Sequence, residues 1–435
     1  MARKGPVRIT AILMAALLLP GILHAEIRGP DSRPARARLA IARVTPLMQN
    51  ENYQQAAEIL KDYQARKQPA TETDDSGYHH PAVYFTLGNC YLMMAHYEQA
   101  AAAYQKAVIR DPSHTRAWLN RARALYEMKQ MTAAGRCFEK AYDTADKKTP
   151  EPLYYSAVAH LMAGDPAQAV ALFERLMAAH PSAMQPEWKE NLVHALLGDN
   201  RFERALPYIR ELVDGYTGEK KMQWQAVLLH QYIQLGMEQA ALDLALLLTR
   251  ETPEVDRWWK SLAYIHLNAG RYEAALAALI PYGFLTSLSR EEKQLIADLS
   301  LEVGIPVKAA SVYEKCLEEK PDKKMLRRLV LAYRQLGQPE KALERIRAFN
   351  HTPEDADLIL LAAQLHYVLE QYGQAADDYR RAARKPGNHR GRAWLMAGYS
   401  AWQAGNFSAA RDALLQAKTY PQQREAAQKA LCEIE

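Results

Sequence analysis

The residues best suited to chemistry are the pair His79-His80, which lie close in sequence to Asp74 and Asp75. Imidazole nitrogens and carboxylate oxygens are common ligands of zinc and other divalent metals. A single His pair in a polar segment is more often solvated than metal-bound, so we expect solvation here. The other eleven His residues are scattered along the chain. The sequence therefore predicts no metal, no cofactor and no catalytic residue.

The spacing patterns that mark common enzymes are also missing from the sequence. The chain has no HExxH, GxSxG, GxGxxG, Walker phosphate loop or CxxC. Its four cysteines, Cys90, Cys137, Cys316 and Cys432, stand singly within helical patterns. In an exported chain a Cys90–Cys137 disulfide is one alternative, and ordinary buried thiols are the favoured one. We expect a protein that is not an enzyme.

Residues 1–25 have the pattern of a secretory signal peptide. A basic start is followed by an apolar run over residues 9–23 and by the small residue Ala25. The run is shorter than the roughly 20 residues that span a bilayer, and Pro20 interrupts it. We therefore expect cleavage after Ala25, in preference to a retained membrane anchor. The mature protein is predicted to be periplasmic.

The charge of the chain argues against a nucleic-acid partner. The formal net charge of +5 falls to +2 when the three basic residues of the signal peptide are removed. No block of Lys and Arg is long enough to suggest a nucleic-acid stripe. The chain has 24 Tyr and 7 Trp but only 7 Phe, and aromatic residues with a polar group favour binding surfaces. We expect protein partners in the cell envelope, with only indirect membrane contact.

These side chains must be positioned by helices, because one small residue recurs through the chain at a helical-repeat interval. After a first gap of 44 residues, the spacing stays between 33 and 36. Each interval holds two segments with apolar residues at steps of three and four, separated by Gly, Asn or Pro. The pattern predicts an all-α, right-handed solenoid of about eleven helix pairs. The recurring residues are Ala56, Ala100, Ala134, Ala169, Ala205, Ala240, Ala274, Ala309, Ala342, Ala375 and Ala410.

This period resembles the tetratricopeptide repeat (TPR), in which small residues allow two helices to approach closely. Gly88 and Gly398 are expected at such close contacts. The resemblance implies a degenerate first repeat and a polar, mobile loop over 26–80, a repeat array over 81–421, and a capping helix over 422–435. The positions that carry it in one unit are Tyr84, Leu87, Gly88, Tyr91, Ala100, Tyr104, Ala107 and Pro112.

The TPR resemblance also implies a concave face lined by the first helix of each pair, which binds protein partners. For any single aromatic residue on that face, packing in the core is an equal alternative. Asn89 and Asn120 occupy places used by a carboxylate clamp, but Phe85, Glu151 and Tyr155 stand where basic residues are needed, so we expect no clamp. The predicted groove residues are Phe85, Asn89, Asn120, Tyr126, Tyr154, Tyr232, Trp259, Tyr367, Tyr399 and Trp402.

A narrower resemblance covers residues 256–279 and 288–317. This part of the chain is similar to exported TPR proteins associated with the TonB, ExbB and ExbD components of bacterial energy transduction. The features are Trp258-Trp259, the Gly270 turn, the run over 290–292 and the run over 304–306. This resemblance implies a non-catalytic periplasmic scaffold that serves a TonB–ExbB–ExbD complex. The alternative is a general envelope scaffold for outer-membrane assembly, secretion or polysaccharide export.

Overall fold

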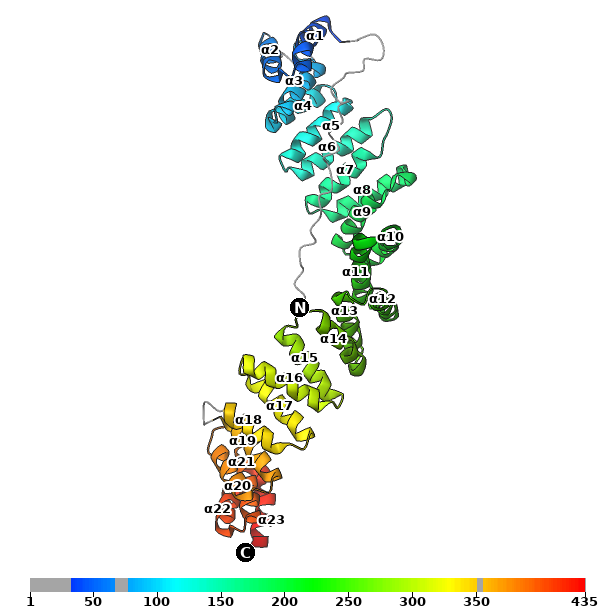
Figure 1. Ribbon diagram of the computed structural model, residues 1–435. Helices are drawn as coiled ribbons and strands as arrows, with labels where there is room; N and C mark the ends of the chain where they lie inside the picture. The colour runs from blue at the N-terminus through cyan, green and yellow to red at the C-terminus, as the bar shows by residue number, and fades with distance from the viewer. Residues whose placement is uncertain (1–32, 67–76, 350–354, 435) are drawn as a thin grey trace. The chain divides into compact units, whose positions relative to one another are not determined.

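The computed structural model describes residues 33–66, 77–349 and 355–434, and all regular elements in these residues are helices (Figure 1). The predicted all-α solenoid class is confirmed. Residues 1–25, which are predicted to form a signal peptide, and residues 67–76 of the predicted polar loop lie outside the described residues. None of the described helices has the length and apolar character needed to cross a membrane.

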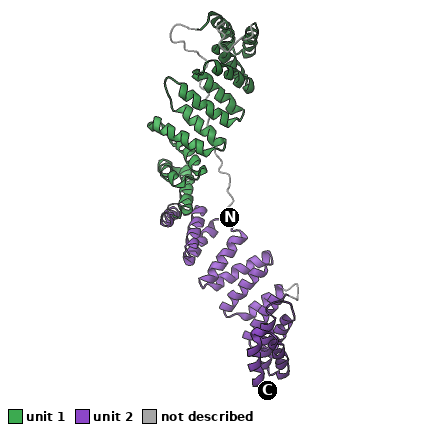
Figure 2. Ribbon diagram, turned by 180° about the vertical axis from the view of Figure 1, so that it is seen from behind, with its two compact units in different colours: residues 1–236 green, residues 237–435 purple. Residues whose placement is uncertain are grey.

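The chain divides into two compact units, which Figure 2 colours separately. Unit 1 covers residues 1–236, and each of its helices packs against the next one in sequence. Its helices are α1 (Ala35–Gln49), α2 (Tyr53–Ala65), α3 (Pro81–Met93), α4 (Tyr97–Arg110), α5 (Thr115–Glu127), α6 (Met131–Thr144), α7 (Glu151–Met162), α8 (Pro166–Ala179), the 3₁₀ turn η3 (Pro181–Ala183), α9 (Pro186–Gly198), α10 (Phe202–Gly215) and α11 (Gly218–Gln234).

Unit 2 covers residues 237–435 and follows the same rule of packing between sequence neighbours. Its helix α23 falls within the segment predicted to form a capping helix. The helices are α12 (Glu238–Glu251), α13 (Asp256–Asn268), α14 (Tyr272–Leu285), α15 (Arg290–Glu302), α16 (Pro306–Glu319), α17 (Lys323–Gln335), α18 (Pro339–Phe349), α19 (Ala356–Val368), α20 (Tyr372–Ala383), α21 (Arg390–Gln403), α22 (Phe407–Lys418), the 3₁₀ turn η4 (Pro421–Gln423) and α23 (Arg424–Ile434).

Every odd-numbered helix from α1 to α21 is joined to the following helix by a short turn that contains one left-handed residue. The described residues thus hold eleven successive helix pairs, followed by α23. A left-handed residue reverses the chain within a few residues, and Gly adopts that conformation without strain. Six turns use Gly and five use another residue. The left-handed residues are Glu51, Ala95, Lys129, Gly164, Asn200, Gly236, Gly270, Gly304, Gly337, Glu370 and Gly405.

The recurring alanines lie in the second helix of each pair, and nine of the eleven are fully buried. The prediction is wrong by one residue at two positions. Ala240 and Ala274 are only half-buried, whereas Ala241 and Ala275 are enclosed. Each of these helices has two adjacent alanines, and the second of the two is the buried one.

Close helix contacts occur at both predicted glycines. A Cβ atom added to Gly88 would lie 2.5 Å from Cε1 of Tyr104, on the second helix of the same pair. At Gly398 it would lie 2.6 Å from Cγ of Leu414. Because real Cβ atoms do not approach so closely, these positions need glycine for the helices to pack as they do.

Candidate interaction surface

First helices of successive pairs lie next to one another in unit 1. Direct contacts join α1 to α3, α3 to α5 and α7 to α9, in addition to the contacts within each pair. At these three contacts, neighbouring first helices lie side by side. The TPR resemblance predicts that the ten groove residues lie on first helices arranged in this way.

Four of these ten residues are buried, which corrects their prediction as exposed groove residues. Asn89, Asn120, Tyr154 and Tyr232 are each less than 9% exposed. Their polar atoms bond to neighbouring helices of the same unit. A side chain so enclosed offers almost no surface to a partner, so these four residues are interhelical packing residues.

The two asparagines form a buried network with Tyr104. The Tyr104 hydroxyl donates to Oδ1 of Asn89 at 2.8 Å, and Nδ2 of Asn120 donates to the same oxygen at 2.9 Å. Burial raises the pKa of Tyr104, which keeps its hydroxyl protonated as the donor. The network links α3, α4 and α5. The side-chain oxygen of Asn89 accepts both hydrogen bonds of this network and is therefore not available to a ligand.

The two buried tyrosines bond across helices in the same way. The Tyr154 ring stacks on Trp188 with a centroid distance of 4.2 Å and an interplanar angle of 7°. The Tyr154 hydroxyl accepts a hydrogen bond of 2.9 Å from Nδ2 of Asn191 on α9. The Tyr232 hydroxyl accepts one of 3.0 Å from Nε of Arg210 on α10. Both rings therefore hold successive repeats together.

The other six predicted residues are half-buried and keep part of their rings accessible. Phe85 and Tyr126 lie in unit 1, and the Phe85 ring is 4.8 Å from the His114 ring. Trp259 in unit 2 donates from Nε1 to the Pro253 carbonyl at 2.8 Å, so its indole lies beside the turn that precedes α13. The remaining three are Tyr367, Tyr399 and Trp402.

Tyr399 and Trp402 line a cleft of about 430 Å³ between α21 and α23. The α23 wall has polar side chains, and Glu425 pairs with Lys429 at 3.0 Å. The structure therefore brings these two half-buried predicted residues together at one cavity. The α23 residues were missed because the tail contains no aromatic or motif residue. The lining is completed by Gln422, Glu425, Ala426, Lys429, Ala430 and Glu433.

Three more apolar residues on the first helices of unit 2 are exposed and were not predicted. They are Tyr264 on α13, Leu331 on α17 and Val368 on α19. Leu331 and Val368 are aliphatic, and the groove prediction from sequence rested mainly on aromatic residues.

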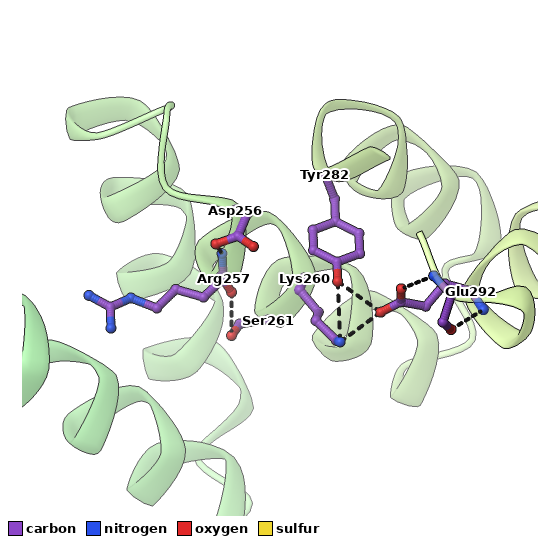
Figure 3. Close-up of polar contacts among 7 residues, drawn as sticks. Asp256, Arg257, Lys260, Ser261, Tyr282 and Glu292 are labelled. Carbon is purple, nitrogen blue, oxygen red and sulfur yellow. Dashed lines mark hydrogen bonds and ion pairs between the residues drawn. The ribbon is translucent and has the colours of Figure 1, made fainter. Parts of the chain in front are cut away.

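The residue after Trp259 belongs to a polar cluster that joins α13, α14 and α15 (Figure 3). Nζ of Lys260 lies 2.7 Å from Oε1 of Glu292 and donates to the Tyr282 hydroxyl at 3.3 Å. The Tyr282 hydroxyl donates to the same Glu292 oxygen at 2.8 Å. The hydrogen bond from Lys260 lowers the pKa of Glu292 to about 2. Both charges are neutralised within the cluster, which therefore acts as a clamp between repeats.

The same arrangement occurs in unit 1 with the charges exchanged. Glu190 on α9 lies 2.5 Å from Nζ of Lys220 on α11 and accepts a hydrogen bond from the Tyr216 hydroxyl. Lys220 and Glu292 are each the third residue of their helices, α11 and α15. In each case a Lys–Tyr–Glu set ties one first helix to the next.

The His pair has a structural role. His79 is buried, and its Nδ1 lies 2.7 Å from the Tyr84 hydroxyl, so the expectation of a solvated residue is wrong. Nδ1 of His80 accepts a hydrogen bond of 3.2 Å from the Ala82 N–H at the start of α3. Across residues 33–66, 77–349 and 355–434, no group of three His, Cys, Asp or Glu residues is placed to hold a metal ion.

The four cysteines are free thiols in the structure. Cys90, Cys137 and Cys316 are buried, and Cys432 on α23 is exposed. Burial raises the pKa of Cys90 to about 12 and also raises the pKa values of Cys137 and Cys316. These three side chains act as small apolar core residues.

Comparison with known families decides what the helix pairs are. A family model described as "Tetratricopeptide repeat" matches residues 85–150, 154–220, 327–389 and 360–424, more than half of the chain. The chain belongs to the tetratricopeptide repeat family. TPR proteins bind other proteins through stacked helix pairs, so this chain is a protein–protein interaction scaffold. The TPR fold is generally non-catalytic.

Several solved structures are similar to this TPR chain at low sequence identity, and no curated protein matches it. A tetratricopeptide repeat protein from Parabacteroides merdae has 13% identity and a TM-score of 0.32 over 69% of this chain and 99% of that one. A structure of Naa15/Naa10 bound to HypK-THB has 15% identity and a TM-score of 0.35, over 88% of this chain and 68% of that one. The hetero-tetramer Cut9–Hcn1 has 13% identity and a TM-score of 0.28, over 92% of this chain and 90% of that one. Values this low carry no argument about partners.

Proposed function

We propose that this TPR protein is a periplasmic, non-catalytic adaptor that binds a component of a TonB–ExbB–ExbD complex through the first helices of unit 2. The main support for this binding surface is the cleft of about 430 Å³, which the half-buried side chains of Tyr399 and Trp402 line. Aromatic side chains at the wall of a cleft provide large contact area with few rotatable bonds. The narrower sequence resemblance around Trp258-Trp259 supports the choice of partner.

The binding surface is tested by substituting Tyr399 and Trp402 with Ala, singly and together. Each substitution is expected to weaken partner capture by about 2 kcal/mol, which corresponds to roughly 30-fold in affinity. Trp118→Ala is the matched control, because Trp118 is a half-buried Trp outside the predicted set. Cross-linking in the periplasm followed by affinity purification identifies the partner, and thermal melting of each variant shows whether the fold is kept.

The outcomes separate a binding role of the aromatic pair from a packing role. Loss of capture with an unchanged melting temperature supports a binding role. An unfolded variant would show that the two aromatic side chains are needed for packing. Undiminished capture by a folded variant would mean that the partner binds elsewhere on the protein. A partner from outer-membrane assembly, secretion or polysaccharide export would favour the general envelope scaffold instead.

Export is a separate part of the proposal and has its own test. Cleavage after Ala25 predicts a mature protein that begins at Glu26. N-terminal sequencing of protein purified from the cell envelope measures this directly. An intact Met1 in that pool would overturn the proposed cleavage.

A further inference from the structure

One segment of unit 2 has a local excess of positive charge. Residues 379–411 contain seven Arg and Lys residues and no Asp or Glu, in a mature chain that is nearly neutral. Six of the seven lie between residues 380 and 392, at the end of α20, in the following turn and in the first turn of α21. Such a concentration produces a local positive potential that the whole-chain charge conceals.

Within this segment, the cations on α20 are paired and several later ones are not. Arg380 lies 2.7 Å from Asp377, and Arg381 lies 3.0 Å from Asp378. Arg384, Arg390 and Arg392 are exposed, and none of them has an ion pair within the described part of the chain. We call these three arginines the basic edge.

The backbone that carries the basic edge is held in one conformation. Nε2 of His389 donates to the Ala382 carbonyl at 3.0 Å, and Nε of Arg390 donates to the Ala383 carbonyl at 3.1 Å. Both bonds reach carbonyl groups in the last turn of α20, and the Ala382 carbonyl also accepts a hydrogen bond of 3.0 Å from the Lys385 N–H. Gly387 has φ of 148°, and a Cβ atom there would lie 2.6 Å from the His389 ring. The arginines therefore project from an ordered turn, which reduces the entropy lost on binding.

The position of two of these arginines is unfavourable for the helix itself. Arg390 and Arg392 lie in the first turn of α21, which has no acidic residue and no side-chain cap. A helix N-terminus carries partial positive charge, so cations there repel it. The N-terminal N–H groups of α21 and the guanidinium groups thus add to one potential. An anion bound at the basic edge would relieve the repulsion.

We propose that the basic edge docks an acidic segment, a run of Asp and Glu residues, of a protein partner. The partner being a protein rests on the proposed function. Guanidinium groups bind carboxylates through two parallel hydrogen bonds, and three unpaired arginines match several carboxylates. The exposed turn over residues 384–390 consists of Arg, Lys, Pro, Gly, Asn and His and offers no large apolar side chain for insertion into lipid. These observations favour an acidic protein segment over a membrane.

The test measures binding of a fluorescein-labelled octaglutamate peptide to the full mature chain by fluorescence anisotropy. Binding is expected at about 50 mM salt and should weaken strongly by about 300 mM, because the interaction is electrostatic. The double variant Arg384→Glu/Arg392→Glu is expected to weaken binding about tenfold or more. Its matched control, Arg250→Glu/Lys341→Glu, reverses two exposed cations elsewhere in unit 2 and is expected to change affinity less than about twofold.

Several results would overturn the proposal. They are an equal loss in the control variant, no octaglutamate binding, or binding of phosphatidylglycerol vesicles or single-stranded DNA in its place. The neutral double variant Arg384→Gln/Arg392→Gln is measured as well. Far-UV circular dichroism of each variant shows whether a loss of binding results from misfolding. Trp402→Ala is measured in parallel and should retain octaglutamate binding. If octaglutamate fails to bind while capture of the partner still depends on Trp402, the basic edge is wrong and the proposed function stands.

Discussion

At the scale of single residues, the decisive feature of the repeats is a side chain that is missing. Gly88 lets the Tyr104 ring lie against the backbone of α3, and this places the Tyr104 hydroxyl within 2.8 Å of Asn89. Asn120 then joins the same oxygen from the next repeat. One absent Cβ atom therefore permits a buried polar network that spans two repeats.

Gly88→Ala is expected to destabilise the protein by about 1–3 kcal/mol, because its Cβ atom would displace the Tyr104 ring from a packed core. Gly373→Ala is the control, since Gly373 is helical and its Cβ atom would meet nothing within 4 Å. The control should be neutral or stabilising by up to about 1 kcal/mol. Urea unfolding followed by circular dichroism measures both. Equal effects of the two substitutions would contradict the close contact at Gly88.

At the scale of elements, the turn within each helix pair occurs in two forms, which differ in the residue at the left-handed position. Six turns place Gly at the left-handed position, and five place a residue with a side chain there. A residue with a Cβ atom is strained by about 1–2 kcal/mol in this conformation. The five strained turns are sites at which the chain can be stabilised.

Lys129→Gly is expected to raise the free energy of unfolding by about 0.5–1 kcal/mol, because relief of strain exceeds the extra entropy of Gly in the unfolded chain. The reverse change, Gly164→Ala, should lower it by about 0.5–1 kcal/mol, because backbone strain again exceeds the opposing entropy difference, in a turn with open space around the Cβ position. Thermal melting of the two variants measures both effects. A lower melting temperature for Lys129→Gly would show that the entropy of Gly in the unfolded chain outweighs the relief of backbone strain.

A second element-scale prediction concerns the clamp between α13 and α15. The pKa of Glu292 lies near 2, below its ordinary value of 4.5, so the clamp stabilises the fold above about pH 4.5. This contribution disappears as the pH falls toward 2. Because Lys260 is 43% exposed and its charge is screened, we expect about 1–2 kcal/mol at neutral pH.

Glu292→Gln should therefore lower stability at pH 7 and change it little near pH 2. Urea titrations across this pH range compare the variant with Glu302→Gln, an exposed residue at the end of the same helix. A deficit of Glu292→Gln that did not shrink on acidification would mean that packing, rather than charge, accounts for its effect.

At the scale of the whole molecule, stability is distributed along the chain. Within each unit, helices contact those next to them or two apart in sequence. The stability of such an array is approximately the sum of what each repeat and each interface between repeats contributes, so each part depends chiefly on its neighbours. The division between residues 236 and 237 is then a natural place to separate two folding units.

Fragments 33–236 and 237–434 are each expected to be helical and to unfold cooperatively when expressed alone, because each keeps its sequence-neighbour contacts. Far-UV circular dichroism and thermal melting of the two fragments measure this. A fragment without helical signal would show that its folding depends on the other unit.

The sequence was sufficient to predict the helix pairs and their number, because a small residue recurs every 33 to 36 residues from Ala100 to Ala410 although the residues around it vary. It was insufficient to choose between Ala240 and Ala241, or between Ala274 and Ala275, because adjacent alanines are chemically identical. One residue turns a helix position by about 100°, so this slip affects which aromatic residues face outward. Trp259 illustrates this, since its indole bonds to the turn before its helix as Trp118 does. Tyr154 was misplaced because a Tyr ring suits a core and a surface equally well.

The burial of three thiols makes the protein ready for site-specific labelling without substitution. A cysteine reacts with a maleimide dye when its thiolate attacks the dye. Cys432 is exposed to the dye, whereas Cys90, Cys137 and Cys316 are buried and burial raises their pKa values, which suppresses their thiolates at neutral pH. Mass spectrometry should therefore find one dye per native chain and four after denaturation. Because Cys432 precedes the cleft residue Glu433 on α23, the dye becomes a reporter beside Tyr399 and Trp402. Its emission would follow occupation of the cleft in real time in the otherwise unaltered protein.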